Sequence, residues 1–457
     1  MFSFRMLLFG VISFIRWMGL STLALMRGAG KKREVPQDRK WWQKPGLSVM
    51  YQIETRPGWK WDRDFIEFNQ SMRDEEGHIK FNGPFCNIKE CVDLSREIGL
   101  DYHVFEMKWH DGICYFKTNT TTWVADKDYA KEFAELSRSA HIPFMYYYSS
   151  VFDHNPQFDA IQPIHRSLPS LIGNRKEYRA YLRKHYAEII EQYRPDGMWF
   201  DWWWADGSTK ATYTYFRKNH PEVVVTFNLS NLFPASFDKI HITSGEAHRY
   251  DGPWAMIRQE DSVKVPVLTS AVKWSNAFRW VFDHQWEVCT PAGKWWQDQT
   301  LREDPLELLR LAAMVLACGG KLCIGATSQM DGHIFPDQVK QLRMLGAWYK
   351  QRKVYFINAA PIRYRWFRPL SVRVHAQGFD MVVSAYENGV LLHIINRSGS
   401  RVGITVTLHG NQWRDFRNAI LVPQNKTILA RCAGSSLHIE IPTDDLDPVD
   451  TILYLRR

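Results

Sequence analysis

The sequence predicts a (β/α)8 barrel of the TIM type followed by a small antiparallel β-domain. Short apolar or aromatic runs alternate with helical patterns, and eight such runs occur within roughly 290 residues, as expected of eight β/α units in a parallel barrel. After about residue 355 the pattern changes to alternating apolar and polar residues around turn signals, which is typical of antiparallel strands. We therefore divide the chain into an N-terminal targeting segment (1–33), a barrel (34–354) and a C-terminal β-domain (355–457).

Residues 1–33 have the features of a targeting segment. Arg5 precedes the apolar run MLLFGVISFI, which suits the core of a signal peptide. A second apolar patch, LSTLALM, follows Arg16. In a single membrane span Arg16 would lie near the centre and cost about 2.5–3.5 kcal/mol. A cleaved signal peptide is therefore our first interpretation, a signal anchor the second, and an amphipathic helix on a cytosolic protein the third. The first two predict an exported protein that is periplasmic, secreted or anchored to a membrane.

The predicted barrel strands are short apolar or aromatic runs. They are expected at 47–52, 101–109, 143–149, 197–203, 223–228, 239–245, 266–272 and 321–326. Helical patterns lie between several of them, at 91–99, 128–141, 176–193 and 304–320. Strands that alternate with helices of this length form parallel β/α units. The fifth and sixth strands are close in sequence, so the unit between them is predicted to be degenerate.

The segment after residue 355 predicts strands without intervening helices. The stretch MVVSAYENGVLLHIINR, residues 381–397, consists of two alternating runs around Glu387, Asn388 and Gly389, which is a hairpin signal. Two further runs, SSLHIEI and TILYLRR, follow it. These runs predict the small antiparallel β-domain.

The net charge of +9 would suit a nucleic-acid partner, but its location argues against one. Six of these charges lie in residues 1–33, which contain no acidic residue: Arg5, Arg16, Arg27, Lys31, Lys32 and Arg33. The other positive charges are spread over the rest of the chain without a Lys/Arg tract. No basic stripe is left to follow a phosphate backbone, so we exclude a nucleic-acid partner.

The spacing of the seven cysteines predicts neither a disulfide framework nor a metal site. An odd and scattered set argues against full pairing, although Cys86 and Cys91 are close enough in sequence to pair locally. No CxxC or Cys/His ligand spacing occurs. We therefore expect neither a metal nor an organic cofactor.

Polar residues follow several predicted strands, at the end where barrel enzymes carry their active sites. Asp201 ends the fourth strand and has aromatic residues on both sides, in WFDWWW. Glu246 follows the sixth strand, Glu287 falls in the loop expected after the seventh, and His110 follows the second. A carboxylate in aromatic surroundings is usually paired with another group or has a function, so Asp201 is the first candidate.

Two carboxyl groups that face each other across a pocket suit glycoside hydrolysis. In a retaining enzyme one attacks the anomeric carbon and the other protonates the leaving oxygen, at a separation of about 5–5.5 Å. The acid needs a raised pKa, which burial among aromatic rings supplies, and the nucleophile needs hydrogen-bond donors that keep it ionised. Structural interpretations are also open: Asp201 could cap a helix, and His110 could be a buried structural histidine.

The order of the motifs resembles that of the α-L-fucosidases of glycoside hydrolase family 29, which are retaining enzymes. KWHDGICYF (108–116) is similar to the family's Lys-His-His-Asp-Gly-Phe motif, and PFMYYYS (143–149) to its Tyr-Tyr-Ser strand. YRPDGMWFD (193–201) resembles the nucleophile strand, SGEAH (244–248) the Thr-Pro-Glu loop, and QWEVC (285–289) the Trp-Glu-x-Cys segment. The resemblance extends from about residue 45 to the C-terminus.

The resemblance implies roles for individual residues. Asp201 would be the nucleophile and Glu287 the general acid/base, with Glu246 in reserve because the family varies the position of its acid. The residues implied to bind the sugar are His110, Trp109, Tyr148, Glu246 and Trp295.

The sequence departs from the family among the residues that bind the sugar. Trp109 and His110 stand in place of the family's paired histidines. The first strand, LSVMYQIE, lacks the histidine that contacts the sugar and has Tyr51 or Gln52 nearby. The resemblance therefore implies a retaining glycosidase for a terminal α-L-fucose or a related sugar. Two alternatives stay open: a catalytically degenerate carbohydrate-binding protein, and a retaining glycosidase for a different sugar. Each of them predicts a glycan as the partner.

Overall fold

The structure is a computed structural model. It describes residues 40–53, 86–158, 172–201, 207–228, 242–246, 257–259, 263–265, 285–294, 296, 300–329, 331–361, 371–374, 378–416 and 418–456. Among these residues no helix has the length and apolar character needed to cross a membrane. The predicted targeting segment, residues 1–33, lies outside them.

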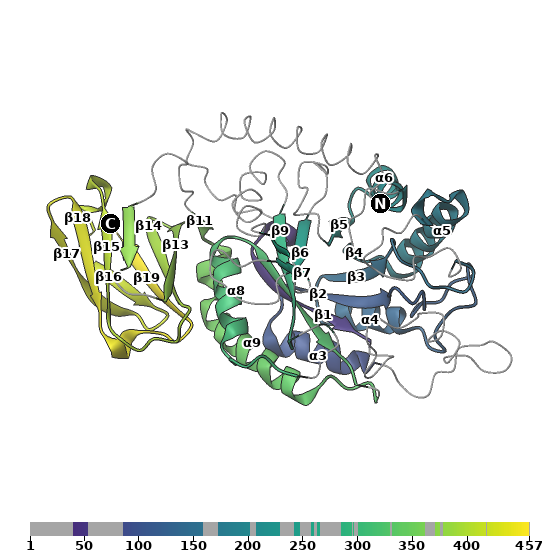
Figure 1. The fold of residues 1–457 in the computed structure, drawn as a ribbon, viewed down its shortest axis with the longest axis horizontal. Helices are drawn as coiled ribbons and strands as arrows, with labels where there is room; N and C mark the ends of the chain where they lie inside the picture. Colours follow the sequence, from purple (N-terminus) through teal and green to yellow (C-terminus); the bar gives the residue numbers. More distant parts are fainter. Residues whose placement is uncertain are drawn as a thin grey trace.

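The first part of the chain forms a closed parallel barrel of eight strands (Figure 1), in the order β1-β10-β9-β6-β5-β4-β3-β2. Its strands are β1 (Gly46–Gln52), β2 (Tyr102–Lys108), β3 (Phe144–Ser149), β4 (Gly197–Asp201), β5 (Val224–Phe227), β6 (Ile242–Glu246), β9 (Gln285–Pro291) and β10 (Lys321–Thr327). A separate two-stranded sheet pairs β7 (Ile257–Gln259) with β8 (Val263–Val265). The predicted barrel fold is confirmed.

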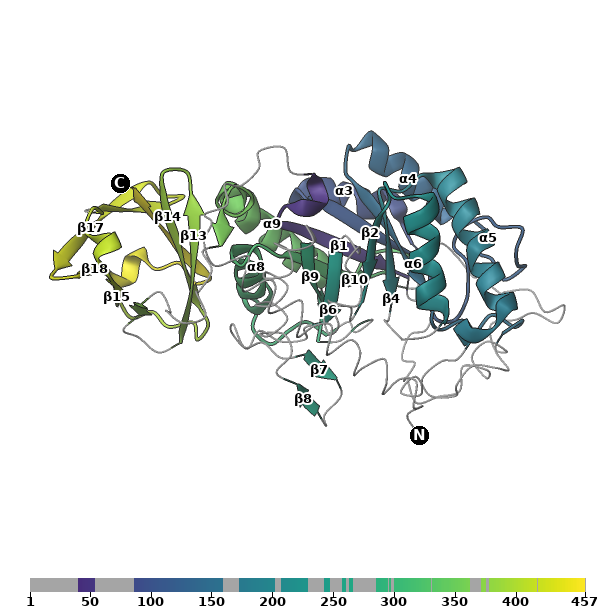
Figure 2. The same cartoon turned by 90° about the horizontal axis from the view of Figure 1, so that it is seen from above.

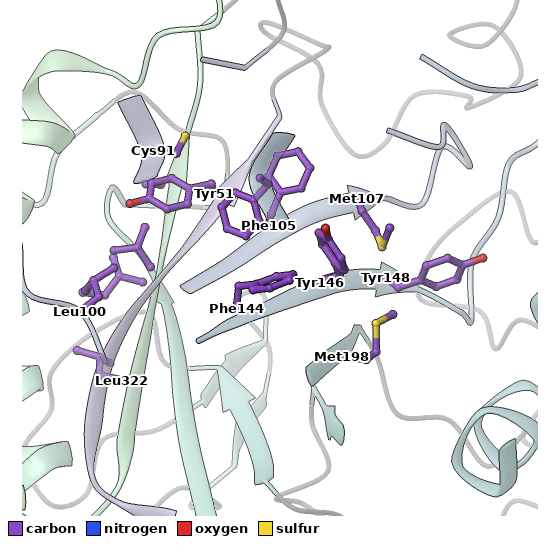
Figure 3. Packing of buried hydrophobic residues seen from close by; sticks show 14 of the residues in the cluster. Tyr51, Cys91, Leu100, Phe105, Met107, Phe144, Tyr146, Tyr148, Met198 and Leu322 are labelled. Atoms are coloured by element: carbon purple, nitrogen blue, oxygen red, sulfur yellow. The ribbon is translucent and has the colours of Figure 1, made fainter. Parts of the chain in front are cut away.

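Each barrel strand alternates between an inner and an outer face. On β3 the inner residues Met145 and Tyr147 belong to the cluster that fills the barrel, together with Trp199 of β4. The outer residues Phe144 and Tyr146 pack in a second cluster between the strands and the surrounding helices (Figure 3). Strands buried on both faces read as continuous apolar runs, which is why most of them were visible in the sequence.

The seventh barrel strand differs from the prediction. The run at 266–272 lies outside the described residues, and the closed barrel takes β9 as its seventh strand. Trp286 and Val288 of β9 pack in the outer cluster, so Gln285 and Glu287 face the barrel interior. Because its inner face is polar, β9 lacks the continuous apolar run of the other strands, and the sequence analysis assigned it to a loop.

Helices surround the barrel (Figure 2). They are α3 (Ile88–Ile98), α4 (Tyr129–Ser139), α5 (Lys176–Tyr193), α6 (Gly207–Asn219), α8 (Glu307–Ala317) and α9 (Pro336–Ile357). Short 3-10 turns occur at Trp41–Gln43, Ile172–Asn174, Asn411–Trp413 and Thr443–Asp445. The first helices begin at capping residues, since the side chains of Asn87 and Asp128 accept hydrogen bonds from the backbone of α3 and α4. Near the start of α3 the thiols of Cys86 and Cys91 lie 3.6 Å apart and form a hydrogen bond, not a disulfide.

The C-terminal part is a nine-stranded sheet, confirming the predicted β-domain. Its strand order is β11-β13-β14-β19-β16-β17-β18-β15-β12. The strands are β11 (Ala360–Pro361), β12 (Ser371–Val374), β13 (Phe379–Tyr386), β14 (Gly389–Asn396), β15 (Ile404–His409), β16 (Asn418–Val422), β17 (Lys426–Ala433), β18 (Ser436–Ile441) and β19 (Asp450–Arg456). The predicted hairpin is present, with Tyr386 paired to Gly389 across the turn.

Helix α8 lies between the barrel and this sheet. It contacts β10 on one side and β13 and β14 on the other, as Figures 1 and 2 show. Every residue from Leu308 to Ala317 is buried, and all of them except Arg310 are apolar, as expected of a helix that is covered on every side.

Candidate active site

Asp201 is the centre of a hydrogen-bonded group at the C-terminal end of β4. Its side chain is buried, and three side chains from neighbouring units of the barrel point at its carboxylate. Tyr147 of β3 donates at 2.5 Å, and the amide of Asn228, directly after β5, donates at 2.8 Å. The Nε2 atom of His110, after β2, lies 3.3 Å away. The carboxylate therefore has partners of the kind that an ionised nucleophile needs.

The partners of Asp201 outweigh the effect of its burial. Burial by itself raises the pKa of this carboxyl group, because it penalises the charged form. The hydrogen bond and charge interaction with His110, followed by the bonds from Tyr147 and Asn228, lower it, and the net pKa lies below the ordinary value. Asp201 is thus ionised at neutral pH although it is buried.

The His110 ring is held in its orientation by a hydrogen bond at Nδ1, the nitrogen that does not face Asp201. Its Nδ1 atom lies 2.7 Å from the Ser149 hydroxyl, which in turn donates to the carbonyl of Phe152 at 2.8 Å. The Trp109 ring lies 4.7 Å from the His110 ring. Burial lowers the pKa of His110 more than Asp201 raises it, so the net pKa is below the ordinary value. His110 is a predicted site residue that the structure brings to Asp201, with Trp109 at its side.

The segment that carries His110 is held by a buried ion pair. The Lys108 ammonium lies 2.9 Å from the Asp153 carboxylate, with both side chains fully buried, and also donates to the Ser149 carbonyl at 2.8 Å. The backbone N–H of His154 donates to the His110 carbonyl at 2.8 Å. These bonds join the loops after β2 and β3, so the His110 ring has a fixed position relative to β4.

Tyr148 points away from Asp201. It lies on the outer face of β3, where its hydroxyl is 2.7 Å from Nδ1 of His185 on α5. Figure 3 shows it with the other buried residues of this outer layer. Its neighbour Tyr147 faces the barrel interior instead and donates to Asp201. The sequence contained the signal for this difference, because alternate residues of a strand face opposite sides.

Glu287 is in the interior of the barrel rather than in a loop. It is the third residue of β9 and pairs in register with Lys321, the first residue of β10. Its carboxylate accepts hydrogen bonds from Tyr102, from Nε1 of Trp199 at 2.8 Å and from the Ser244 hydroxyl at 2.8 Å. Trp199 precedes Asp201 by two residues on β4, so Glu287 lies nearer the N-terminal end of the barrel than Asp201 does.

Burial raises the pKa of Glu287. The hydrogen bonds from Trp199, Tyr102 and Ser244 oppose that effect without cancelling it. The raised pKa would suit an acid, and the partners of this carboxyl group are Tyr102, Trp199 and Ser244.

The side chains of two other predicted site residues, Glu246 and Trp295, are not described by the structure. Glu246 is the last residue of β6, paired with Cys289, so its backbone lies at the same edge of the barrel as Asp201. Trp295 lies outside the described residues. The sequence analysis missed Asn228, although it ends the predicted fifth strand and so occupies the same edge of the barrel.

Comparison with known proteins supports the resemblance seen in the motifs. A family model described as alpha-L-fucosidase matches residues 63–353, more than half of the 457 residues. The fold is similar to that of an alpha-fucosidase from Thermotoga maritima in complex with a mechanism-based inhibitor. That comparison has a TM-score of 0.64 and 17% identity, and it covers 91% of this chain and 96% of that one. No curated protein was found to match the sequence.

Two further solved structures share the fold. Alpha-L-fucosidase isoenzyme 1 from Paenibacillus thiaminolyticus has a TM-score of 0.65 and 18% identity, over 91% of this chain and 97% of that one. A GH29 alpha-L-fucosidase from Bacteroides thetaiotaomicron, a trapped covalent intermediate in complex with 2-fluoro-fucosyl fluoride, has a TM-score of 0.64 and 16% identity. It covers 93% of this chain and 98% of that one. At these identities the structures establish the fold, and the match to the family model establishes that this chain belongs to the α-L-fucosidase family.

Proposed function

We propose that this protein is a retaining glycosidase of the α-L-fucosidase type, with Asp201 as its nucleophile. The observation that carries the proposal is the buried Asp201 carboxylate at the end of β4, held by three side chains and kept ionised by them. The match to the α-L-fucosidase family model gives the reaction class. The proposed substrate is a terminal α-L-fucose or a related sugar.

The proposed reaction has two steps. The Asp201 carboxylate attacks the anomeric carbon, while the bond to the leaving oxygen breaks and that oxygen takes a proton from an acid. The product is a glycosyl ester of Asp201. Water then attacks the same carbon, gives its proton to the residue that acted as the acid, and releases the sugar with its original configuration. Tyr147 and Asn228 would hold the carboxylate in position for both steps.

We favour Glu246 over Glu287 as the general acid/base. Glu246 ends β6 at the edge of the barrel where Asp201 lies, which is where barrel enzymes carry their chemistry. Glu287 lies within β9, with its carboxylate bonded to Tyr102, Trp199 and Ser244. In this arrangement Glu287 would support the site through Trp199 instead of touching the substrate.

Hydrolysis of aryl glycosides tests the proposal. Purified protein would be assayed with 4-nitrophenyl α-L-fucoside and a panel of other 4-nitrophenyl glycosides, beside Asp201→Asn and Asp201→Gly variants. We expect turnover of one α-L-configured substrate and a loss of at least about 10³-fold in both variants, as for other nucleophile substitutions. Azide should restore turnover in Asp201→Gly and give a glycosyl azide. Full activity of Asp201→Asn on the substrate of the wild type would refute the assignment.

A second candidate is carbohydrate binding without cleavage. It is favoured by Trp109, which stands in place of one of the family's paired histidines, and by the first strand, which lacks the family's histidine and has Tyr51 or Gln52 nearby. This candidate predicts that a folded wild-type protein binds glycans on an array but hydrolyses none of the panel.

We also propose that the protein is exported. The support is the charge and apolar pattern of residues 1–33. Expression of the full chain with N-terminal sequencing of the mature protein tests this, because a cleaved signal predicts a new N-terminus near Gly28 or Gly30. An intact N-terminus on protein from the cytosolic fraction would contradict export.

A further inference from the structure

Two neighbouring strands carry a pair of polar side chains on the inner wall of the barrel. Met50 of β1 pairs in register with Val104 of β2, and both belong to the cluster inside the barrel. Two residues further along each strand, Gln52 and Glu106 therefore face the same interior. The backbone N–H of Ile53 donates to the Glu106 carboxylate at 3.3 Å, which ties the end of β1 to this side chain.

This pair lies on the same wall as the proposed nucleophile. Glu106 pairs in register with Tyr147 of β3, and the Tyr147 hydroxyl donates to Asp201 at 2.5 Å. Gln52, Glu106, Tyr147 and Asp201 thus come from four consecutive strands of the barrel, β1 to β4, near their C-terminal ends. A sugar that reaches Asp201 would meet this wall.

Gln52 has an unsatisfied hydrogen-bonding atom. The residue is only 5% exposed, and within the part of the chain that the structure describes its Oε1 atom accepts no hydrogen bond. Buried amide groups are nearly always paired, because leaving one unpaired costs free energy. A ligand hydroxyl would supply the missing donor.

An indole ring borders the same space. A Cβ atom on Gly325 of β10 would lie 2.3 Å from the Trp296 ring and 3.1 Å from Oε1 of Gln52. Only glycine at this position lets the ring and the amide approach each other. An indole face beside a polar pair is a combination that suits a sugar, which has C–H patches next to its hydroxyl groups.

We propose that Gln52 and Glu106 are specificity-determining residues that bind hydroxyl groups of the sugar, with Trp296 beside its apolar face. This inference rests on the proposed function, and it names the substrate class more closely. A neutral sugar can donate hydroxyl protons to both Glu106 and Gln52. A uronic acid would instead bring a second carboxylate close to the Glu106 carboxyl group, so we expect neutral sugars to be preferred.

The test uses a matched pair of buried glutamines. Gln52→Leu removes the amide in the barrel, and Gln341→Leu removes a buried amide on α9 whose Oε1 also accepts no hydrogen bond within the described residues. Both variants, with Glu106→Gln, would be assayed on 4-nitrophenyl α-L-fucoside and on its 2-, 3- and 4-deoxy analogues. A sugar that proves to be the better substrate would replace fucose in this series.

We expect Gln52→Leu to lower kcat/KM for the parent glycoside by about tenfold or more, as for the loss of one hydrogen bond. Its effect on one deoxy analogue should be much smaller, because that analogue lacks the bound hydroxyl. Glu106→Gln should change the preference among the analogues too, and Gln341→Leu should not. Equal loss on every analogue, or none, would overturn the inference. A melting curve for each variant separates these outcomes from loss of folding.

Binding provides a readout that does not depend on turnover. Calorimetric titration of the Asp201→Asn variant with the free sugars, with and without Gln52→Leu, keeps the two proposals apart. Sugar binding that depends on Gln52, together with a folded wild-type protein that hydrolyses none of the glycoside panel, would refute the glycosidase and support the role of Gln52 in sugar binding. Hydrolysis that substitutions of Gln52 and Glu106 do not change would support the glycosidase and refute the role of these two residues in sugar binding. If the protein neither binds nor hydrolyses sugars, both proposals are refuted.

Discussion

At the residue scale, the charge of Asp201 depends on three side chains that come from three separate β/α units. Each contributes one hydrogen bond or ion pair, and together they reverse the effect of burial on the pKa of the carboxyl group. The sequence located Asp201 and His110, because both follow strand signals. It indicated Tyr148 in place of Tyr147, because three consecutive tyrosines on β3 hide which face each one occupies until the strand is placed between its neighbours.

The pair Tyr147 and Tyr148 therefore gives a controlled test of this site. Tyr147→Phe removes a donor to the ionised carboxylate, so the pKa of Asp201 should rise. Activity requires the ionised form, so the acidic limb of the kcat/KM profile should move to higher pH by about 1 unit, corresponding to a hydrogen bond of about 1.5 kcal/mol to a charged group. Tyr148→Phe is the control, since its hydroxyl contacts His185 on α5. The same acidic limb in both variants would contradict this role of Tyr147.

At the element scale, the strands with apolar inner faces were predictable and β9 was not. The prediction placed β1 to β6 and β10 correctly within a few residues. Both faces of β1 to β5 and β10 are buried, and most of their residues are apolar. The interior of β9 carries Gln285 and Glu287, whose partners come from other strands and loops far apart in sequence. No local pattern indicates such partners, so the sequence alone could not place Glu287 in the barrel interior.

The two glutamates should respond differently to substitution. Glu287→Leu leaves the donors Tyr102, Trp199 and Ser244 without an acceptor, so it should lower the free energy of unfolding by about 3 kcal/mol. Urea denaturation measures this change. Glu246→Gln should lower kcat by about 10²–10⁴-fold on substrates with poor leaving groups, as for loss of a general acid.

Leaving-group dependence supplies the control for this comparison. An acid is least needed when the leaving group is already good, so Glu246→Gln should lose less activity on a 2,4-dinitrophenyl glycoside than on an alkyl glycoside. If Glu287→Gln shows this dependence and Glu246→Gln does not, the assignment of the acid must be reversed.

At the scale of the whole molecule, the buried core around the barrel is shared in part with the β-domain, which also has a core of its own. Ile395 of β14 and Val449, just before β19, belong to the hydrophobic cluster that surrounds the barrel. Arg352 of α9 donates to Asp447 at 2.6 Å across the same boundary. The change of pattern near residue 355 indicated where the second sheet begins. The sequence could not show that α8 packs on both parts, because an apolar helix gives no sign of which surfaces cover it.

This shared core predicts that the two parts unfold together. Ile395→Ala should destabilise the protein by about 2–4 kcal/mol, as for other buried isoleucines, although the residue belongs to the β-domain. Because the lost contacts are with the barrel cluster, far-ultraviolet circular dichroism and hydrolytic activity should be lost at the same, lower temperature. Val402→Ala is the control, since that side chain is 69% exposed and should leave the melting temperature unchanged. A variant whose β-sheet signal melts first while hydrolytic activity persists would show that the barrel is stable without this contact, and that α8 does not couple the unfolding of the two parts.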